Sequence, residues 1–316
     1  MILTITMNPS IDFTYFIDSL TVDKLNRTKR SVRNVGGKGI NAGRTAALSG
    51  ADVILTGFLG GKIGTLTRDY LKDEDLFRLE MTQIESEIRT AITIMHDDNQ
   101  HTEVVETGPL IQDEEIFELL FKVKKIVADE PITSILICGS VNTNNDHIFK
   151  EIIDYIRREI DNELPILVDI SGIQLKNLLQ TKGNKPTFIK PNEHELSHFL
   201  DTPVKTKKEA YLALRHESFS NIPYVIASLG GDGAVCKIDD DFYQASIPQI
   251  EILSVTGSGD ATVGGFAYAL EQKFDLIQAI KYAMACGMSN ARHRESGKID
   301  KEEVAKFMEQ IIVEKL

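Results

Sequence analysis

The stretch Val255-Thr256-Gly257-Ser258-Gly259-Asp260-Ala261-Thr262-Val263-Gly264-Gly265-Phe266 joins a glycine-rich turn to an apolar helix. Gly257 and Gly259 permit backbone conformations that a Cβ atom would exclude. The unpaired N–H groups at the start of the helix can bind an anion such as a transferring phosphoryl group. Asp260 can accept a proton from an attacking hydroxyl, or it can simply cap the helix. This stretch alone leaves both interpretations open.

A second glycine-rich stretch, Asn34-Val35-Gly36-Gly37-Lys38-Gly39-Ile40-Asn41, opens a helix near the other end of the chain. It is neither a Walker loop nor a dinucleotide fingerprint, because it lacks their glycine spacing and the lysine followed by serine or threonine. It does combine a close backbone approach, a helix N-terminus and a cation. These features suit a phosphorylated or polyhydroxylated ligand.

The composition is typical of a globular protein with an acidic surface. The 316 residues can bury a large core, and the net charge of −12 argues against a general nucleic-acid or anionic-membrane surface. No apolar run approaches the ~20 residues that span a bilayer. We therefore expect no nucleic-acid or membrane partner, and a cytoplasmic location because no signal-peptide pattern is found. Cys138, Cys236 and Cys286 lie in apolar sequence, which predicts buried reduced thiols.

Patterns of strands and helices alternate along most of the chain. A buried strand is predicted at 2–7, and the alternation is regular from residue 113 onward, which predicts an α/β fold. Strand-like runs at 12–35 and 78–107 interrupt it and predict a small β lid. The last third is predicted to hold helices at 259–271, 276–289 and 300–313. Because no linker or repeat divides the chain, we expect a single domain, 1–316.

The segment His194-Glu195-Leu196-Ser197-His198 fits the zinc-peptidase pattern H-E-x-x-H. On a long helix both imidazoles would share a face, and Glu195 could activate a zinc-bound water. The predicted helix is short, however, and Asn192 with Glu195 has the spacing of a capping box. Glu195 could also face a hydrated Mg²⁺ near nucleotide phosphates. A zinc site, a helix cap and a magnesium contact are the three alternatives for this segment.

The two glycine-rich stretches resemble the paired signatures of the ribokinase-like sugar kinases, in their phosphofructokinase B branch. Gly-Gly-Lys-Gly together with Leu-Asn-Arg is most similar to 1-phosphofructokinases and tagatose-6-phosphate kinases. Further motifs resemble the branch in its order: Met7-Asn8-Pro9-Ser10-Ile11-Asp12, Leu25-Asn26-Arg27, Gly108-Pro109, Gly139-Ser140, Lys190-Pro191-Asn192 with Glu195, and Ser228-Leu229-Gly230-Gly231-Asp232-Gly233. The resemblance implies an α/β three-layer αβα sandwich with a central mostly parallel sheet and a small β-sheet lid. It also implies ATP and Mg²⁺ as cofactors and a homodimer formed through the lid.

The resemblance further implies roles for individual residues. Asp260 is the expected catalytic base, with Thr256, Gly257 and Gly259 in the anion hole. The expected ligands of the sugar hydroxyls are Asp12, Gly37 and Asn41, and those of the sugar phosphate are Lys38, Arg27, Arg89 and Ser140. Nucleotide binding is expected to involve Lys190, Asn192, Ser228, Gly230, Gly233, Thr256, Gly257, Gly259 and Asn290. Asp169 and Glu195 are expected to support Mg²⁺.

These expectations lead to a functional hypothesis with named rivals. The favoured reaction is ATP-dependent phosphorylation of a ketohexose monophosphate, with fructose 1-phosphate as acceptor and fructose 1,6-bisphosphate as product. Tagatose-6-phosphate kinase is the nearest alternative, and a low-turnover sugar-phosphate sensor and the zinc peptidase are weaker ones. One departure from the branch follows Gly139-Ser140: many relatives continue with a hydrophobic residue and proline, whereas here Val141 leads into the loop Asn142-Thr143-Asn144-Asn145. We expect this loop to contact the substrate differently.

Overall fold

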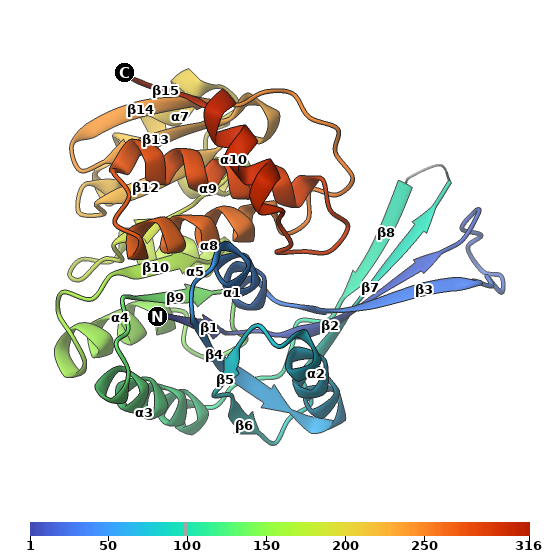
Figure 1. Cartoon of the computed structure of the whole chain (residues 1–316). Helices are drawn as coiled ribbons and strands as arrows, with labels where there is room; N and C mark the ends of the chain where they lie inside the picture. The colour runs from blue at the N-terminus through green and yellow to red at the C-terminus, as the bar shows by residue number, and fades with distance from the viewer. Residues whose placement is uncertain (98–99) are drawn as a thin grey trace.

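The chain forms a large β-sheet flanked by helices and a small β-sheet that projects from it (Figure 1). The computed structural model describes residues 1–97 and 100–316. In these residues the large sheet has the order β15-β14-β13-β12-β11-β10-β9-β1-β4-β5, and β6 also pairs with β4. Its strands are β1 (Ile2–Thr6), β4 (Val53–Gly60), β5 (Arg78–Leu79), β6 (Thr82–Ile84), β9 (Ser134–Cys138), β10 (Ile166–Asp169), β11 (Phe188–Ile189), β12 (Tyr224–Ser228), β13 (Ala234–Ile238), β14 (Asp241–Ser246) and β15 (Ile312–Lys315).

The large sheet is parallel in its centre and antiparallel at one end. β1 pairs in parallel with both β4 and β9, and parallel pairing continues through β10, β11 and β12. β13, β14 and β15 follow β12 as antiparallel strands. The carboxyl ends of the parallel strands share one edge, which is where ligands bind in open α/β sheets.

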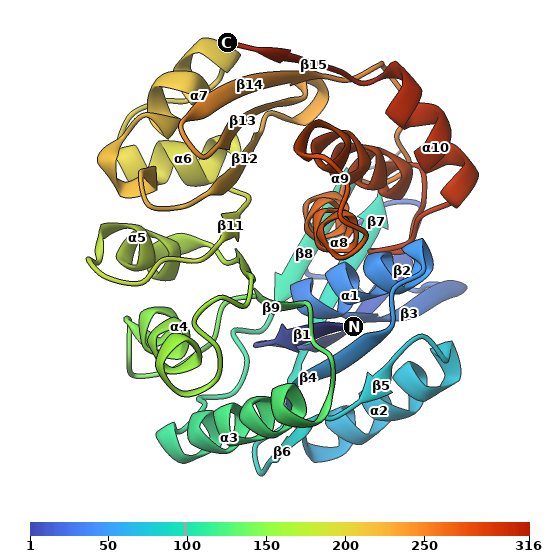
Figure 2. The same cartoon turned by 60° about the vertical axis from the view of Figure 1, so that its left-hand side comes forward.

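Helices cover both faces of the large sheet, so the molecule has three layers (Figure 2). One face carries α3 (Asp113–Asp129), α4 (Ile148–Glu159), α5 (Gly172–Gln180), α6 (Glu193–Leu200) and α7 (Lys207–Leu214). The other carries α1 (Lys38–Ser49), α8 (Ser258–Glu271) and α9 (Leu276–Ala291), with α10 (Lys301–Gln310) packed on α9 and α2 (Gly61–Glu74) on β4. The predicted α/β class is confirmed.

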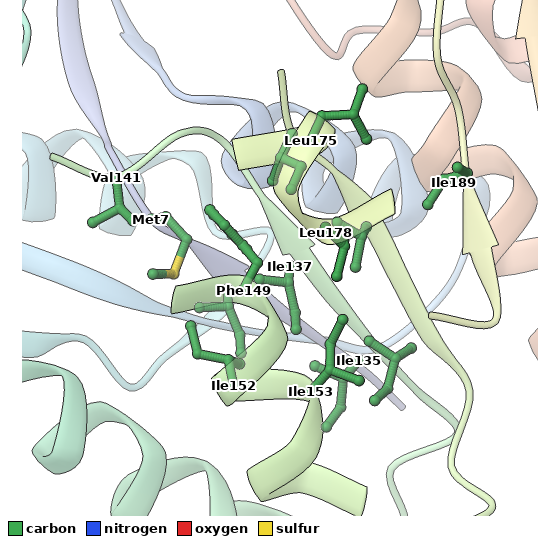
Figure 3. Close-up of a cluster of buried hydrophobic side chains, with 14 of the residues drawn as sticks. Met7, Ile135, Ile137, Val141, Phe149, Ile152, Ile153, Leu175, Leu178 and Ile189 are labelled. Carbon is green, nitrogen blue, oxygen red and sulfur yellow. The ribbon is translucent and has the colours of Figure 1, made fainter. Parts of the chain in front are cut away.

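The alternation of side chains along the strands divides the core into two clusters. Ile5 of β1 belongs to the cluster beneath α3 to α7, whereas Ile2 belongs to the cluster beneath α8 and α9. Figure 3 shows part of the first cluster, in which Phe149 and Ile152 of α4 lie beside Ile137 of β9. Burying one such side chain contributes ~1.5–3 kcal/mol. Buried side chains on both faces of the sheet therefore stabilise the strands that carry the candidate site at their carboxyl ends.

The small sheet has the order β3 (Arg30–Gly36), β2 (Ser10–Phe16), β7 (Arg89–His96) and β8 (Gln100–Val105). β2 pairs antiparallel with β3 and parallel with β7, and β7 pairs antiparallel with β8. Every residue of β7 is only half-buried. Residues 98 and 99, which belong to the second predicted lid segment, lie outside the described residues.

Two sequence predictions need correction. The second lid segment was expected to begin at residue 78, but β5 and β6 pair in parallel with β4 and so belong to the large sheet. Alternating apolar residues identify a strand but not the sheet that it joins. The helix expected at 300–313 ends at Gln310, because the β-branched residues Ile312 and Val313 pair with β14 instead.

Several elements were missing from the sequence prediction. α5 was not expected, although Leu175, Leu178 and Leu179 have helical spacing and are buried. β13 and β14 were also missed, because short apolar runs after a glycine-rich turn carry little periodicity. The three cysteines are free and buried, as predicted. No helix in the described ranges is both long and apolar enough to cross a membrane.

Candidate active site

The carboxyl edge of the large sheet collects polar residues from both ends of the chain. Asn8 follows β1, Asp169 ends β10, and Lys190 follows β11. The N-termini of α1 and α8 reach the same edge, because the two helices pack together and Gly264 allows their close contact. A Cβ atom at Gly264 would overlap the backbone carbonyl of Ala42. The two glycine-rich stretches, far apart in the sequence, therefore meet in one site.

The N-terminus of α8 begins at Gly257 and has no side-chain cap. Gly257 has φ +83, and a Cβ atom there would lie 2.7 Å from Ser296 Cβ, so only glycine fits this turn. The backbone N–H groups of Gly259 and Asp260 donate to no atom of the described residues. Such unpaired groups at a helix N-terminus bind anions.

Asp260 does not cap its helix. It lies in the first turn of α8 and is 8% exposed. Its Oδ2 accepts a hydrogen bond of 2.8 Å from Nδ2 of Asn41 on α1. The capping interpretation of Asp260 was therefore wrong, and a buried carboxylate that faces the site is available as a base.

The electrostatic surroundings favour the protonated form of Asp260. Burial, followed by the negative charge of Asp169, raises the pKa of Asp260 to about 7, against the opposing effects of Lys38, Asn41 and Lys190. A base whose pKa is near neutrality is well matched to proton transfer at that pH. The Asp260 carboxyl group is thus placed for general-base catalysis.

Lys38 and Asp169 form an ion pair across the site, with Nζ and Oδ1 3.0 Å apart. Burial acts to lower the pKa of Lys38, but the carboxylates of Asp169, Asp260 and Glu195 outweigh it and raise that pKa. Burial likewise acts to raise the pKa of Asp169, but Lys38 and Lys190 hold it below its usual value. Both groups therefore stay charged, and Lys38 lies within the electrostatic influence of Asp260 as well as of Asp169.

Lys190 places a second positive charge at the N-terminus of α8. The side chain is 6% exposed, and its Nζ lies against the backbone of Gly259, only 2.9 Å from where a Cβ atom would be. An ammonium group beside unpaired N–H groups strengthens an anion site. The structure therefore brings the predicted nucleotide ligand Lys190 to the predicted anion hole.

A separate polar cluster lies where the two sheets join. Asp12 accepts a hydrogen bond of 2.6 Å from Ser10 Oγ and packs against the backbone of Gly36. Burial raises the pKa of Asp12, opposed by Ser10 and by the charge of Arg89, whose own pKa is lowered by burial. Gly37, the N-cap residue of α1, continues from this cluster to Lys38. Four of the predicted sugar ligands therefore lie in one continuous region: Asp12, Arg89, Gly37 and Lys38.

The helix at the zinc-peptidase pattern is a capped short helix. Asn192 Oδ1 accepts hydrogen bonds from the backbone N–H groups of His194 and Glu195, while Glu195 Oε2 accepts from that of Asn192 at 2.9 Å. The His194 side chain is 89% exposed. Among residues 1–97 and 100–316, no group of three or more His, Cys, Asp and Glu side chains is arranged to hold a metal ion. The capping box is confirmed, and the geometry gives the zinc interpretation no support.

The remaining nucleotide candidates differ in accessibility. Ser228 bridges to Asn192 across the strand edge, Thr256 is exposed, and a side chain at Gly230 would meet no atom within 4 Å. Gly233 instead packs closely on β14. Asn290 has no exposed surface, and its Nδ2 donates to the backbone carbonyls of the 295–298 turn. Asn290 therefore supports a turn beneath the anion hole and presents no atom to the edge.

Of the two remaining predicted sugar-phosphate ligands, Arg27 lies apart from the site, whereas Ser140 follows β9 at the carboxyl edge, where the N–H of Gly139 donates to Asp169 O at 2.9 Å. Arg27 is exposed in the connection between β2 and β3, at the far end of the small sheet (Figure 1). Ser140 is exposed after β9, and its loop is fixed by Asn142, whose Nδ2 donates to Gly108 O at 3.0 Å. The structure thus does not bring Arg27 to Asp260 within one chain. The hydrogen bond from Asn142 joins the unusual loop at 142–145 to Gly108, in the segment that follows β8 of the small sheet.

Some residues that build the site were missed from the sequence. Arg44 and Glu74 form an ion pair with Nε and Oε2 2.8 Å apart, and Arg44 also contacts Asn41 and Ser296. The one signal available was spacing, since Arg44 follows Asn41 by three residues and shares its helix face. The contacts of Glu74 and Ser296 are long-range and have no sequence pattern.

Known proteins match the chain over nearly its whole length. The model of the pfkB family carbohydrate kinases matches residues 2–302. The tagatose-6-phosphate kinase of Staphylococcus epidermidis is 34% identical over 316 residues, 99% of this chain and 99% of the relative. The structure of phosphofructokinase-2 from Escherichia coli has a TM-score of 0.86 at 21% identity, covering 98% of each chain. A possible 1-phosphofructokinase from Thermotoga maritima has a TM-score of 0.86 at 22% identity, covering 100% of this chain and 99% of that one.

Proposed function

The chain belongs to the pfkB family of carbohydrate kinases, and from this we propose that it transfers the γ-phosphoryl group of ATP to a ketohexose monophosphate. The observation that carries the proposal is the arrangement at α8, where the buried carboxyl group of Asp260 adjoins unpaired N–H groups and Lys190. A base and an anion site within one turn of helix suit phosphoryl transfer to a hydroxyl group.

In the proposed mechanism, Asp260 accepts the proton of the sugar hydroxyl as its oxygen attacks the γ-phosphorus. The N–H groups of Gly259 and Asp260 stabilise the charge on the transferring group, and the ammonium of Lys190 adds to this field. Asn41 holds the Asp260 carboxylate through its amide nitrogen. The leaving group is ADP, with the γ-phosphoryl group in line between the two oxygens.

Glu195 fits the Mg²⁺ that a nucleotide brings. Its Oε2 is used by the capping box, while its Oε1 has no hydrogen-bond partner among the described residues. Hydrated Mg²⁺ needs only one or two carboxylates when phosphates complete its shell, and it would neutralise phosphate charge there. The charge of Asp169 is instead matched by Lys38. We therefore assign Glu195 as the magnesium-facing carboxylate and Asp169 as the partner that fixes Lys38.

Asp12 and Arg89 are proposed to bind the sugar acceptor at the end that lies away from the hydroxyl group deprotonated by Asp260, where the sugar carries its phosphate. Arg89 pairs with Ser10 across β2 and β7, and its charge acts on the Asp12 carboxyl group. A guanidinium group binds phosphate through paired N–H donors. The motifs of the sequence favour fructose 1-phosphate as acceptor. The relative at 34% identity supports tagatose 6-phosphate instead, and we propose that sugar first, with fructose 1-phosphate as the alternative.

We also propose that the small sheet closes the site as a lid and pairs two copies of the chain. The half-buried residues of β7 and the exposed Val104 and Val105 of β8 support this, because an isolated chain leaves them in water. Light scattering of the purified protein is expected to give twice the chain mass. A monomer at micromolar concentration would contradict the pairing.

The decisive test is ADP formation with tagatose 6-phosphate, fructose 1-phosphate, fructose 6-phosphate and the corresponding unphosphorylated sugars. Turnover is expected with the phosphorylated acceptors, with the highest kcat/KM for tagatose 6-phosphate. Absence of sugar-dependent ADP formation with every acceptor would refute the proposal and favour the low-turnover sensor. The same panel tests the phosphate contact, because Arg89→Ala is expected to raise KM far more for phosphorylated than for unphosphorylated sugars.

A further inference from the structure

Arg44 contacts the catalytic carboxylate indirectly, through the side-chain amide of Asn41. Its Nη1 donates to Asn41 Oδ1 at 3.1 Å. The amide nitrogen of the same side chain, Nδ2, donates to Asp260 Oδ2 at 2.8 Å. One planar amide group thus connects the arginine to the base.

Every N–H donor of the Arg44 guanidinium group has an acceptor. Nε and Nη2 donate to the two carboxylate oxygens of Glu74, each at 2.8 Å. Nη2 also donates to Val35 O at 3.3 Å, and Nη1 to Ser296 O at 2.7 Å. With the bond to Asn41, all five N–H groups have acceptors. Arg44 is 11% exposed and is therefore held between β3, α2 and the turn after α9.

This arrangement determines which way the amide of Asn41 points. A guanidinium group has only donors, so it can face the amide oxygen but not the amide nitrogen. In the ionised form in which Asp260 acts as a base, its carboxylate has only acceptors, so it can face the amide nitrogen but not the amide oxygen. A rotation of the amide by half a turn would set donor against donor at Arg44 and acceptor against acceptor at Asp260. The two ends together therefore allow one orientation.

We propose that Arg44, clamped by Glu74, is a positioning residue that orients Asn41 so that its amide nitrogen holds Asp260 for proton transfer. The inference rests on the proposed function, because the position of the base matters only if a sugar hydroxyl is phosphorylated. Lysine cannot replace arginine here, since a single ammonium group does not span Glu74, Asn41 and Ser296 at once.

A double-mutant cycle in kcat tests the positioning role. Arg44→Lys is expected to lower kcat about tenfold or more and to change the sugar KM much less, because a misplaced catalytic group can cost ~10²-fold. In the Asn41→Ala background, the same substitution is expected to lower kcat by less than about threefold, since its target is absent. An equal decrease in both backgrounds would overturn the proposal.

A matched control comes from Arg157, a part-buried arginine outside the site. Its Nη1 donates to the backbone carbonyls of Asn162 and Leu164. Arg157→Lys is expected to lower Tm but to leave kcat unchanged, and an equal loss of kcat would reduce Arg44 to a purely structural role. If Arg44→Lys does not fold, Glu74→Gln replaces it in the cycle, because this variant weakens the clamp while Arg44 stays in place.

Thermal unfolding tests the contact without any turnover. The decrease in Tm caused by Arg44→Lys is expected to be smaller in the Asn41→Ala background than in the wild-type chain. Additive decreases would show that the two side chains do not interact and would overturn the inference. If the wild-type protein phosphorylates no sugar, the proposed function fails, yet the Tm cycle still decides whether Arg44 holds Asn41.

Discussion

The helices α8 and α6 both begin at the carboxyl edge of the large sheet, but they satisfy their first N–H groups in opposite ways. α6 uses local side chains: the Asn192 side chain accepts hydrogen bonds from two backbone N–H groups, and the Glu195 carboxylate accepts one from the backbone N–H of Asn192. α8 starts at Gly257 with no side-chain cap, and its first-turn carboxylate, Asp260, bonds to Asn41 on α1.

The difference identifies which helix end is built to bind an anion. A capping box stabilises a helix by filling the donors that an anion would otherwise use. The glycine turn of α8 leaves the donors at Gly259 and Asp260 unfilled among the described residues, and Lys190 adds a positive charge. We therefore expect substitutions at the start of α8 to affect chemistry most and those at the Asn192 cap of α6 to affect mainly stability.

Asp260→Asn is expected to have the largest effect. The amide cannot accept the proton of the sugar hydroxyl, so kcat should fall by ~10²–10⁴-fold, the usual contribution of a general base. Asparagine is nearly isosteric, and the fold should therefore persist. Steady-state ADP formation with the best acceptor measures the effect, with circular dichroism as the check on folding. A kcat within about tenfold of wild type would remove Asp260 from the role of base.

Gly257→Ala is expected to come next. The methyl group would lie 2.7 Å from Ser296 Cβ at φ +83, so the turn must shift and its N–H groups move away from the phosphoryl group. Loss of one such donor costs ~10²-fold or more in kcat. The matched control is Gly172→Ala, because Gly172 also has positive φ and an added Cβ there would meet no atom of the described residues within 4 Å. Similar decreases in kcat for both variants would show that backbone strain alone explains the result.

The pH dependence of kcat/KM tests the electrostatic side of the comparison. Asp260 acts as a base only when ionised, and its pKa is raised to about 7 by burial and by the charge of Asp169. Activity is therefore expected to be full above this pH and to fall about tenfold per pH unit below it. A pH profile of the wild-type enzyme measures this limb. A midpoint near the ordinary aspartate pKa would show that Lys38 and Lys190 outweigh the burial of Asp260 in the free enzyme.

Local patterns predicted the parts of this comparison that depend on neighbouring residues. The capping box at Asn192 and Glu195 follows from spacing, and the open turn at Gly257 follows from its glycines. The partners across the fold did not follow, because Lys38 with Asp169 and Asn41 with Asp260 meet only after α1 and α8 pack together. For the same reason, the sequence position of Arg27 within a lid segment did not predict its large distance from Asp260 in one chain.

The smallest expected effect concerns α6, where Asn192→Ala removes the side-chain cap. The variant should lose about 1 kcal/mol in the free energy of unfolding, as is usual for an N-cap residue. Thr206→Ala is the matched control, because Thr206 caps α7 with the same reciprocal bonds to Glu209. Urea unfolding should give similar losses for the two variants, while Asn192→Ser, which retains a capping oxygen, should lose less.

The two capping variants are expected to differ in one respect, the binding of ATP. Asn192 is a proposed nucleotide ligand, so Asn192→Ala is expected to raise the KM for ATP where Thr206→Ala does not. Its kcat should nevertheless fall far less than that of Gly257→Ala, because water can satisfy the N–H groups of α6 that lose their cap. If kcat falls as far as it does for Gly257→Ala, then the capped N-terminus of α6 takes part in phosphoryl transfer beyond the proposed Mg²⁺ contact of Glu195, and the distinction between a capped and an open helix end does not hold for this protein.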